Sequence, residues 1–358
     1  MIFSSMRLFN KFHAVCALAV CSILLSAWLL ASQHYYRRAI STDAEYGFRT
    51  VKTFDRRLVV FGDSWSDDEN GGVDVQGSVW TVWLCSMFSC HHENLAKTAQ
   101  SLRGTQIGSV VDNAELSGIL LSLSKSPVAD FKTQVNRWTA AESQVLEELA
   151  GDEDAISSRM NHTIVTVAFG VWDIWNMIGK DHDTAVKSVD HCVETIMDQL
   201  DSLSRALGTD DLKVILTLAP DVTFLPAFRD AAEQRVTRHK DTVLITEYWN
   251  KKLRESAEKW DHGLIYLFDT NAFLVDLIRD RQLYDAGIEE PNGLGKNVDP
   301  GWENVDDSCV TQAAMTSEVK QCDTPEKYLF WNDMHLGPSA HRLMGTEVYQ
   351  GIEKMWIK

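Results

Sequence analysis

The chain has 358 residues, enough for one large α/β domain or two small ones, and long enough to bury a sizeable core. Hydrophobic residues make up 45% of it and charged residues 24%, as in an ordinary globular protein. The formal net charge of -17 argues against a nucleic-acid partner, and against adhesion to anionic membranes through charge alone.

The first strong signal along the chain is an apolar segment near the N-terminus. Residues 14–31 (AVCALAVCSILLSAWLLA) carry no charge, and with His13 and Ser32 they reach the roughly 20 residues that a bilayer span needs. A signal peptide that is cleaved after export, giving a secreted protein, is the alternative. We expect a short cytosolic tail, a transmembrane signal anchor, a polar stem and one folded domain, at residues 1–12, 13–33, 34–56 and 57–358.

The domain opens with a short apolar run at 58–61, which is typical of a buried parallel strand. Gly62 and Asp63 end the run and leave Ser64 at its carboxyl end, where ligands bind in open α/β sheets. A serine at such a corner exposes its hydroxyl and frees the following N–H groups to face an anion, as a nucleophile requires. The alternative is an Asp-Ser turn that caps a helix.

Strands and helices alternate over the rest of the domain. Runs of β-branched and apolar residues predict further strands at 163–169, 213–219 and 264–268. Helical patterns are found at 79–84, 114–150, 183–207, a long stretch ending at Trp260, 271–283 and 338–356. This alternation predicts right-handed βαβ units and a parallel sheet covered on both faces, with a loop-rich region over 282–327.

Cysteines and one glycosylation acceptor indicate a compartment outside the cytosol. Cys85 lies close to Cys90 in the sequence, and Cys309 to Cys322, so each pair is spaced to close a small disulfide loop under oxidising conditions. Asn161 begins an Asn-His-Thr acceptor for N-glycosylation. We expect the chain beyond residue 34 to be lumenal or extracellular, in the secretory pathway or at the cell surface. The chain has no Cys-x-x-Cys spacing, so its cysteines do not indicate a metal site.

The last informative stretch is 328–338 (YLFWNDMHLGP), just before the final predicted helix. It places His335 near the carboxylate of Asp333. An acyl-transfer base needs this arrangement, because one imidazole nitrogen takes the serine proton while an acceptor holds the other. His335 is therefore the candidate base for Ser64.

With a serine near the start and a histidine near the end, the chain resembles the GDSL/SGNH hydrolase superfamily, in particular fungal-type acylhydrolases grouped with carbohydrate esterases. The resemblance covers nearly all of the domain and is carried in the family's order by residues 61–67 (FGDSWSD), 169–175 (FGVWDIW) and 330–335 (FWNDMH). Trp65 stands where the name-giving leucine would be. The resemblance implies a three-layer α/β/α sandwich with a central parallel sheet, flavodoxin-like, here preceded by one transmembrane helix. It also implies serine esterase chemistry with no metal or organic cofactor.

The resemblance assigns the reacting groups. Ser64 matches the nucleophile, with its backbone N–H as one oxyanion donor, and His335 matches the base. Trp172 falls on the family's oxyanion asparagine and offers an indole N–H in its place. Gly104 is the candidate for the family's block-two glycine, with Gly108 as the alternative.

The acid of the triad departs from the family's pattern. The family's aspartate, three residues before the histidine, is Asn332 here, and Asp333 lies one residue closer. Either Asp333 rotates into the acid's role, or a Ser-His dyad works with Asn332 or a carbonyl orienting the ring. The remaining residues of the matched motifs are expected to support the turns of the site: Gly62, Asp63, Gly170 and Asp173.

The sequence therefore predicts a membrane-anchored serine esterase that cleaves O-acyl esters, with acylated glycans as one substrate class. Ser64 would attack the ester carbonyl, His335 would shuttle the proton, and water would release the acyl group. The expected partners are the ester and, through the N-terminal helix, the lipid bilayer. Two alternatives stay open: a catalytically impaired relative that binds glycan or lipid, and a secretory-pathway O-acyltransferase that hands the acyl group to a sugar.

Overall fold

The computed structural model describes residues 50–68, 76–100, 106–116, 128–229, 235–291, 294–296, 299–312 and 319–356. The predicted tail, the predicted anchor over 13–33 and the stem as far as residue 49 lie outside these residues. Within the described residues, no helix combines the length and the apolar character that a bilayer span needs.

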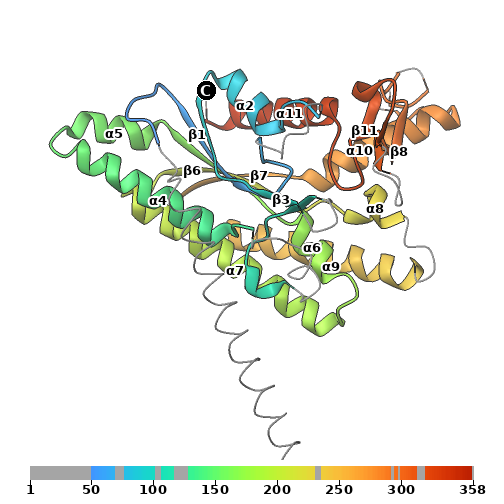
Figure 1. Cartoon of the computed structure of the whole chain (residues 1–358), viewed down its shortest axis with the longest axis horizontal. Helices are drawn as coiled ribbons and strands as arrows, with labels where there is room; N and C mark the ends of the chain where they lie inside the picture. The colour runs from blue at the N-terminus through green and yellow to red at the C-terminus, as the bar shows by residue number, and fades with distance from the viewer. Residues whose placement is uncertain are drawn as a thin grey trace, which may run out of the picture. The chain divides into compact units, whose positions relative to one another are not determined.

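A five-stranded parallel sheet forms the centre of the domain (Figure 1). Its strands, in spatial order, are β2 (His91–Asn94), β1 (Arg57–Gly62), β5 (Thr163–Ala168), β6 (Leu212–Thr217) and β7 (Gly263–Phe268). Numbered along the chain within this sheet, the order is 2-1-3-4-5, as in flavodoxin-like doubly wound sheets. Such sheets bind ligands at the point where successive connections leave in opposite directions, which here is the carboxyl end of β1 and β5.

The apolar run at 58–61 forms β1, and the other three predicted strands form β5, β6 and β7, so these predictions are confirmed. β1 is buried at every position, because it pairs with β2 on one side and β5 on the other and lies under the helices that cover the two faces of the sheet. β2 was not predicted from the sequence. Its residues, His-His-Glu-Asn, are polar because the strand lies at the edge of the sheet and is only partly covered.

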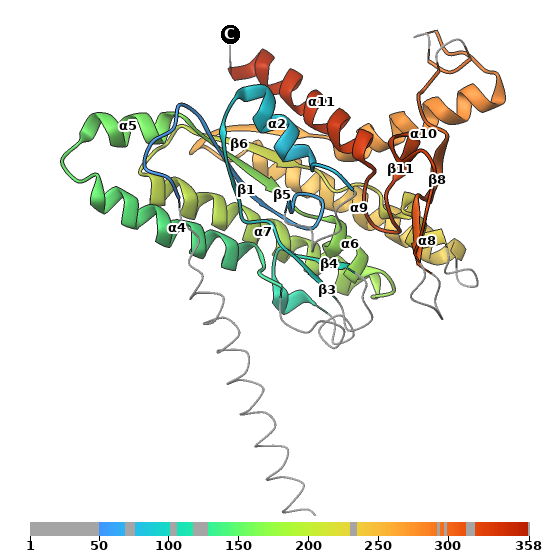
Figure 2. The same cartoon turned by 45° about the horizontal axis from the view of Figure 1, so that its top comes forward.

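Helices cover both faces of the sheet (Figures 1 and 2). On one face, α2 (Trp80–Phe88) packs against α11 (Pro338–Trp356). The other face is covered by α4 (Phe131–Glu148), α7 (His182–Leu207) and α9 (Arg235–Ala257). The other described α-helices are α5 (Glu153–Asn161), α6 (Val171–Met177), α8 (Pro226–Arg229) and α10 (Thr270–Ala286).

Short strands lie outside the central sheet. β3 (Thr98–Gln100) pairs antiparallel with β4 (Gln106–Gly108). The region predicted to be loop-rich contains β8 (Asn304–Ser308), β9 (Val310–Gln312) and β10 (Val319–Gln321). β9 pairs with β10, and β8 pairs in parallel with β11 (Tyr328–Phe330), the strand that precedes the predicted base.

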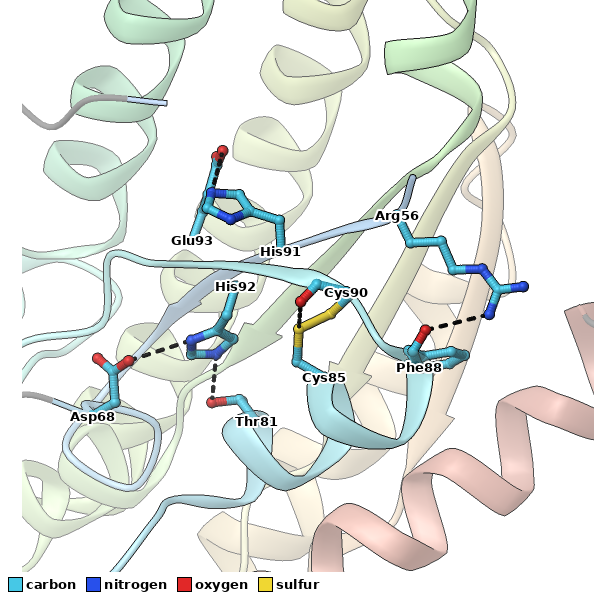
Figure 3. The surroundings of a disulfide bond; sticks show 9 residues. All are labelled: Arg56, Asp68, Thr81, Cys85, Phe88, Cys90, His91, His92 and Glu93. Atoms are coloured by element: carbon cyan, nitrogen blue, oxygen red, sulfur yellow. Dashed lines mark hydrogen bonds and ion pairs between the residues drawn. A yellow bond between two sulfur atoms is a disulfide. The ribbon is translucent and has the colours of Figure 1, made fainter. Parts of the chain in front are cut away.

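Both predicted disulfides are present, Cys85–Cys90 and Cys309–Cys322, which indicates an oxidising compartment. The first joins α2 to the residue before β2 (Figure 3). Asn161 is exposed at the end of α5, so the predicted acceptor lies on the surface.

The disulfide lies beside a second link between the same elements. Figure 3 shows His92 of β2 between two side chains, Asp68 from the segment after β1 and Thr81 from α2. Its Nδ1 is 3.3 Å from an Asp68 carboxylate oxygen and its Nε2 is 3.2 Å from the Thr81 hydroxyl. Asp68 lies a few residues beyond Ser64, so this histidine connects the segment after β1 to both β2 and α2.

Charged side chains are buried at the amino end of β1. Arg57 donates two hydrogen bonds to Glu142 of α4, at 2.7 and 3.0 Å, and Arg159 of α5 donates two more at 2.7 and 2.6 Å. Both guanidinium groups lie over the ring of Phe54, 4.6 and 5.0 Å from its centroid. Thr50 accepts from both arginines, so part of the predicted stem is bound to the domain. Burial would raise the pKa of Glu142, but hydrogen bonds and charge from the two arginines lower it below its ordinary value.

Replacing Glu142 with Gln should strongly destabilise the domain, because it removes the carboxylate that both buried guanidinium groups share and leaves only Glu93, 3.6 Å from Arg57, as a buried counter-charge. We expect the free energy of unfolding to fall by about 3–5 kcal/mol, as measured by denaturant titration at neutral pH. Glu148→Gln is the matched control, since Glu148 is on the same helix but pairs with Lys52 at the exposed surface. Its effect should stay within about 0.5 kcal/mol. Equal effects of the two substitutions would contradict a structural role for the buried cluster.

Candidate active site

Ser64 lies in a tight turn that directly follows β1. The Asp63 N–H donates to the Ala168 carbonyl at 3.0 Å, so pairing with β5 continues into the turn. The Trp65 N–H donates to Asp63 Oδ1 at 3.0 Å and closes the turn around the serine. A Cβ on Gly62 would lie 2.9 Å from the Ala168 carbonyl oxygen, so this close approach of two strands requires glycine. Gly62 and Asp63 thus both contact the backbone of this turn or of β5, where the sequence predicted a supporting role for them.

A second segment reaches Ser64 from the end of β5. Gly170 has a φ of +126°, a conformation that favours glycine, and it directly precedes α6 as the N-cap residue. Trp172 lies in the first turn of this helix, and its indole N–H donates to Ser64 Oγ at 2.8 Å. Asp173 accepts the Gly170 N–H at 3.1 Å and the Val111 N–H at 2.9 Å. It therefore ties the start of α6 to the segment that follows β4.

Gly108, the last residue of β4, lies against the serine. A Cβ on Gly108 would lie 2.2 Å from Trp172 Nε1 and 2.8 Å from the Ser64 backbone nitrogen. Only a residue without a side chain lets the indole and the serine amide approach each other here. Gly104, the first candidate for this position, lies outside the described residues, and the structure brings the alternative, Gly108, to the site.

The predicted base follows β11 in a short loop. Asn332 Oδ1 accepts three hydrogen bonds, from the Met334 N–H and the His335 N–H at 3.0 Å each and from His335 Nδ1 at 2.8 Å. Two backbone N–H groups can only donate, so the Asn332 atom they meet must be the amide oxygen. The ring therefore donates from Nδ1 and carries its lone pair on Nε2. This is the tautomer that a general base for serine requires.

His335 is buried, and among the described residues its Nε2 has no hydrogen-bond partner. Burial lowers the pKa of His335 to about 4, so the ring is neutral and able to accept a proton at neutral pH. Ser64 Oγ is engaged by Trp172 in this structure, with no hydrogen bond to His335 within the described part of the chain. The two segments nevertheless meet, because the Trp65 indole N–H donates to the Met334 carbonyl at 2.7 Å.

Asp333 does not contact the imidazole nitrogen in this structure. Its Oδ1 accepts the Ser308 hydroxyl at 2.6 Å, and its carbonyl accepts the Ala227 N–H at 3.0 Å. Of the orienting groups that the sequence left open (Asp333, Asn332 or a carbonyl), Asn332 is the one in contact with the ring of His335.

Two carboxyl groups are buried beneath the nucleophile. Burial raises the pKa of Asp63 to about 8, with the nearby Asp173 as a further cause, and raises that of Asp173 to about 7. Asp63 Oδ2 has no partner among the described residues. The folded state thus keeps protons that the unfolded chain releases near pH 4. These groups lower the stability of the fold as the pH rises from about 4 to about 8.

Sequence reasoning missed Gln134, which supports the turn from α4. Its side-chain amide donates to the Gly62 carbonyl and accepts the Gly62 N–H, both at 2.9 Å. Gln134 is 1% exposed and lies among the apolar residues of α4 that face the sheet, beside Phe131 and Val135. A polar residue on an otherwise apolar helix face was the available signal, but it does not say which backbone group the side chain binds.

No protein-family model matches the sequence, and no curated protein matches it. Among solved structures, the chain is similar to an acetylxylan esterase from Geobacillus stearothermophilus, with 12% identity and a TM-score of 0.37. The alignment covers 86% of this chain and 95% of that chain. At this identity and TM-score the similarity does not bear on which residues act here.

Replacing Asn332 with Asp should raise the pKa of His335. A carboxylate beside Nδ1 favours the imidazolium, and an opposite charge at this range shifts a pKa by about 1–3. We expect the pKa to rise from about 4 into the range 5–7, as measured by NMR titration of labelled histidine, with His335→Gln used to assign the signal. Asp333→Asn is the matched control and should leave this pKa unchanged. If Asp333→Asn changes the pKa of His335 and Asn332→Asp does not, then Asp333, and not residue 332, orients the ring.

Proposed function

We propose that the protein is a serine esterase that cleaves O-acyl esters with Ser64 as nucleophile and His335 as base. One observation carries the proposal. At the carboxyl ends of β1 and β5, a serine oxygen accepts an indole hydrogen bond next to a loop whose buried imidazole has a free lone pair on Nε2. The first step of acyl transfer needs a serine hydroxyl as nucleophile and a neutral imidazole with a free lone pair as base.

In the proposed reaction, Ser64 Oγ attacks the carbonyl carbon of the ester and its proton passes to His335 Nε2. The tetrahedral intermediate collapses when Nε2–H gives that proton to the alcohol oxygen, which leaves. A water molecule then attacks the acyl-serine and loses a proton to Nε2; the C–Oγ bond breaks as Nε2–H returns that proton to Ser64 Oγ, which releases the carboxylic acid and restores both residues. His335 alternates between base and acid, so no metal or organic cofactor is required.

Trp172 is proposed as the side-chain donor that stabilises negative charge in this reaction. Its N–H is 2.8 Å from Ser64 Oγ, so it can stabilise that oxygen as the proton leaves. The oxyanion is the former carbonyl oxygen, carried by the carbon that becomes bonded to Oγ, and the same indole N–H is proposed to donate to it. The Ser64 backbone N–H would be the second donor.

Asn332 orients the base without supplying a negative charge. In the serine protease template, an asparagine in place of the aspartate lowers kcat about 10⁴-fold because it selects the wrong tautomer. Here the amide oxygen faces Nδ1, so the tautomer is correct and only the charge stabilisation of the imidazolium is missing. We therefore expect a working dyad, slower than a full triad.

The proposal extends to location and substrate class. The two disulfides support a lumenal or extracellular domain. The apolar segment over 13–33 is proposed to anchor the domain to a membrane, and O-acylated carbohydrate is proposed as the substrate on the strength of the sequence resemblance.

The full chain, purified in detergent, should hydrolyse p-nitrophenyl acetate and release acetate from acetylated xylan. Ser64→Ala should lose this activity and its labelling by a serine-reactive phosphonate, because both require Oγ. Since the base must be neutral, kcat/KM should fall only as the pH drops through about 4, not near the ordinary histidine value of 6.5.

Three results would lead elsewhere. Equal inertness of wild type and Ser64→Ala, with no phosphonate labelling, favours a protein that only binds glycan or lipid. Activity that appears only after a sugar acceptor is added favours an acyltransferase. An acid limb near 6.5 would mean that a more exposed histidine acts as the base.

Trp172→Phe should lower kcat by about 10²–10³-fold, because a phenyl ring replaces the indole and the N–H donor is lost. Steady-state kinetics on the same esters measure the effect. Trp175→Phe is the control, since Trp175 lies on the same helix but contacts the ring of Phe228, away from Ser64. If the two variants lose activity equally, the indole N–H of Trp172 has no specific role.

A further inference from the structure

The loop that carries His335 is held by side chains from the nucleophile's own part of the chain. The Trp65 indole N–H donates to the Met334 carbonyl at 2.7 Å, and the Gln76 amide donates to the Leu336 carbonyl at 3.0 Å. These two carbonyls directly precede and directly follow the histidine. Trp65 and Gln76 are each 3% exposed, so both hydrogen bonds are protected from water.

The orientation of Gln76 is set by its surroundings. A carbonyl can only accept, so the atom of Gln76 that meets Leu336 is the amide nitrogen. The same nitrogen lies 3.3 Å from Nε2 of His341, a buried residue of α11, which therefore accepts. Gln76 thus contacts both the His335 loop and the helix that follows it.

The other hydrogen bonds at His335 come from the loop itself. Asn332 accepts the His335 N–H, and the Trp331 N–H donates to the His335 carbonyl at 2.8 Å. These bonds shape the loop and turn the ring, but they move with the loop and cannot set its distance from Ser64. The bond from Trp65 can, because Trp65 is the residue next to the nucleophile, and the bond from Gln76 joins the other side of the histidine to the segment that leads into α2. A leucine at position 65, as in the motif that names the family, has no donor.

We propose that Trp65 and Gln76 are positioning residues that hold the His335 loop in place relative to Ser64. The proposal rests on the reaction proposed above, in which Nε2 must reach the serine proton. A misplacement of about 1 Å at a reacting group can cost about 10²-fold in rate, so two hydrogen bonds on either side of the base are enough to matter.

The test uses Trp65→Phe and Gln76→Met in the full chain, since both keep apolar bulk and remove the N–H donor. We expect kcat on p-nitrophenyl acetate to fall by about 10²-fold with little change in KM. The double variant should lose less than the product of the two single effects, because both substitutions release the same loop.

A second readout does not depend on turnover. His335 owes its low pKa to burial, and His341 is the titratable group that faces it from α11. A released loop admits water, so the NMR-measured pKa of His335 should rise from about 4 towards the ordinary 6.5 in both variants. If wild type is inert on esters, this measurement still decides whether the two residues hold the loop.

Trp80→Phe is the matched control. Trp80 is also fully buried, and its indole N–H donates to the Ser66 hydroxyl at 3.1 Å, next to the nucleophile turn but not to the His335 loop. It should leave the pKa of His335 unchanged and kcat within a few-fold. The proposal is overturned if folded Trp65→Phe or Gln76→Met, checked by thermal unfolding, keeps the wild-type pKa and kcat. It is also overturned if Trp80→Phe matches their effects.

Discussion

β1 pairs in parallel with β2 on one side and with β5 on the other, and the rest of the candidate site depends on this arrangement. The chain leaves β1 and β5 at the same edge of the sheet, where connections diverge. Ser64 is carried by the turn after β1 and Trp172 by the helix after β5. Gly62 lets the two strand ends approach closely enough for the indole to reach the serine oxygen.

The base belongs to a different kind of structure. His335 follows β11, which lies outside the central sheet, and the loop closes on β11 through a β-bridge between Phe330 and Leu336. Hydrogen bonds from other parts of the chain attach this loop to the domain. Asn332 selects the tautomer, while burial keeps the ring neutral. The proposed chemistry therefore relies on the position of the base more than on a charged partner. Trp65 and Gln76 bear on that position, because they hydrogen-bond to the loop that carries His335.

The two ends of β1 serve different purposes. At the amino end, Arg57, Arg159 and Glu142 form a buried ionic cluster whose hydrogen bonds are all made within the protein. At the carboxyl end, Asp63 Oδ2 and His335 Nε2 are buried without partners among the described residues. A satisfied cluster stabilises the strand, whereas unsatisfied polar groups cost stability and are the ones free to engage a substrate or a proton.

The sequence by itself determined the strands β1, β5, β6 and β7 and the place of Ser64 after the first of them, and it indicated the two cysteine pairs, whose bonds the structure shows. These features depend on local patterns of apolar residues or on short spacings. It missed β2, whose polar residues look like a loop, and it left Asn332 and Asp333, and Gly104 and Gly108, undecided. Only the tertiary structure decided the partners of Trp65 and Gln76, which lie 269 and 260 residues away along the chain. Hydrogen bonds between side chains and a distant backbone leave no periodicity in the sequence, because the donor needs only one polar atom and the acceptor can belong to any residue.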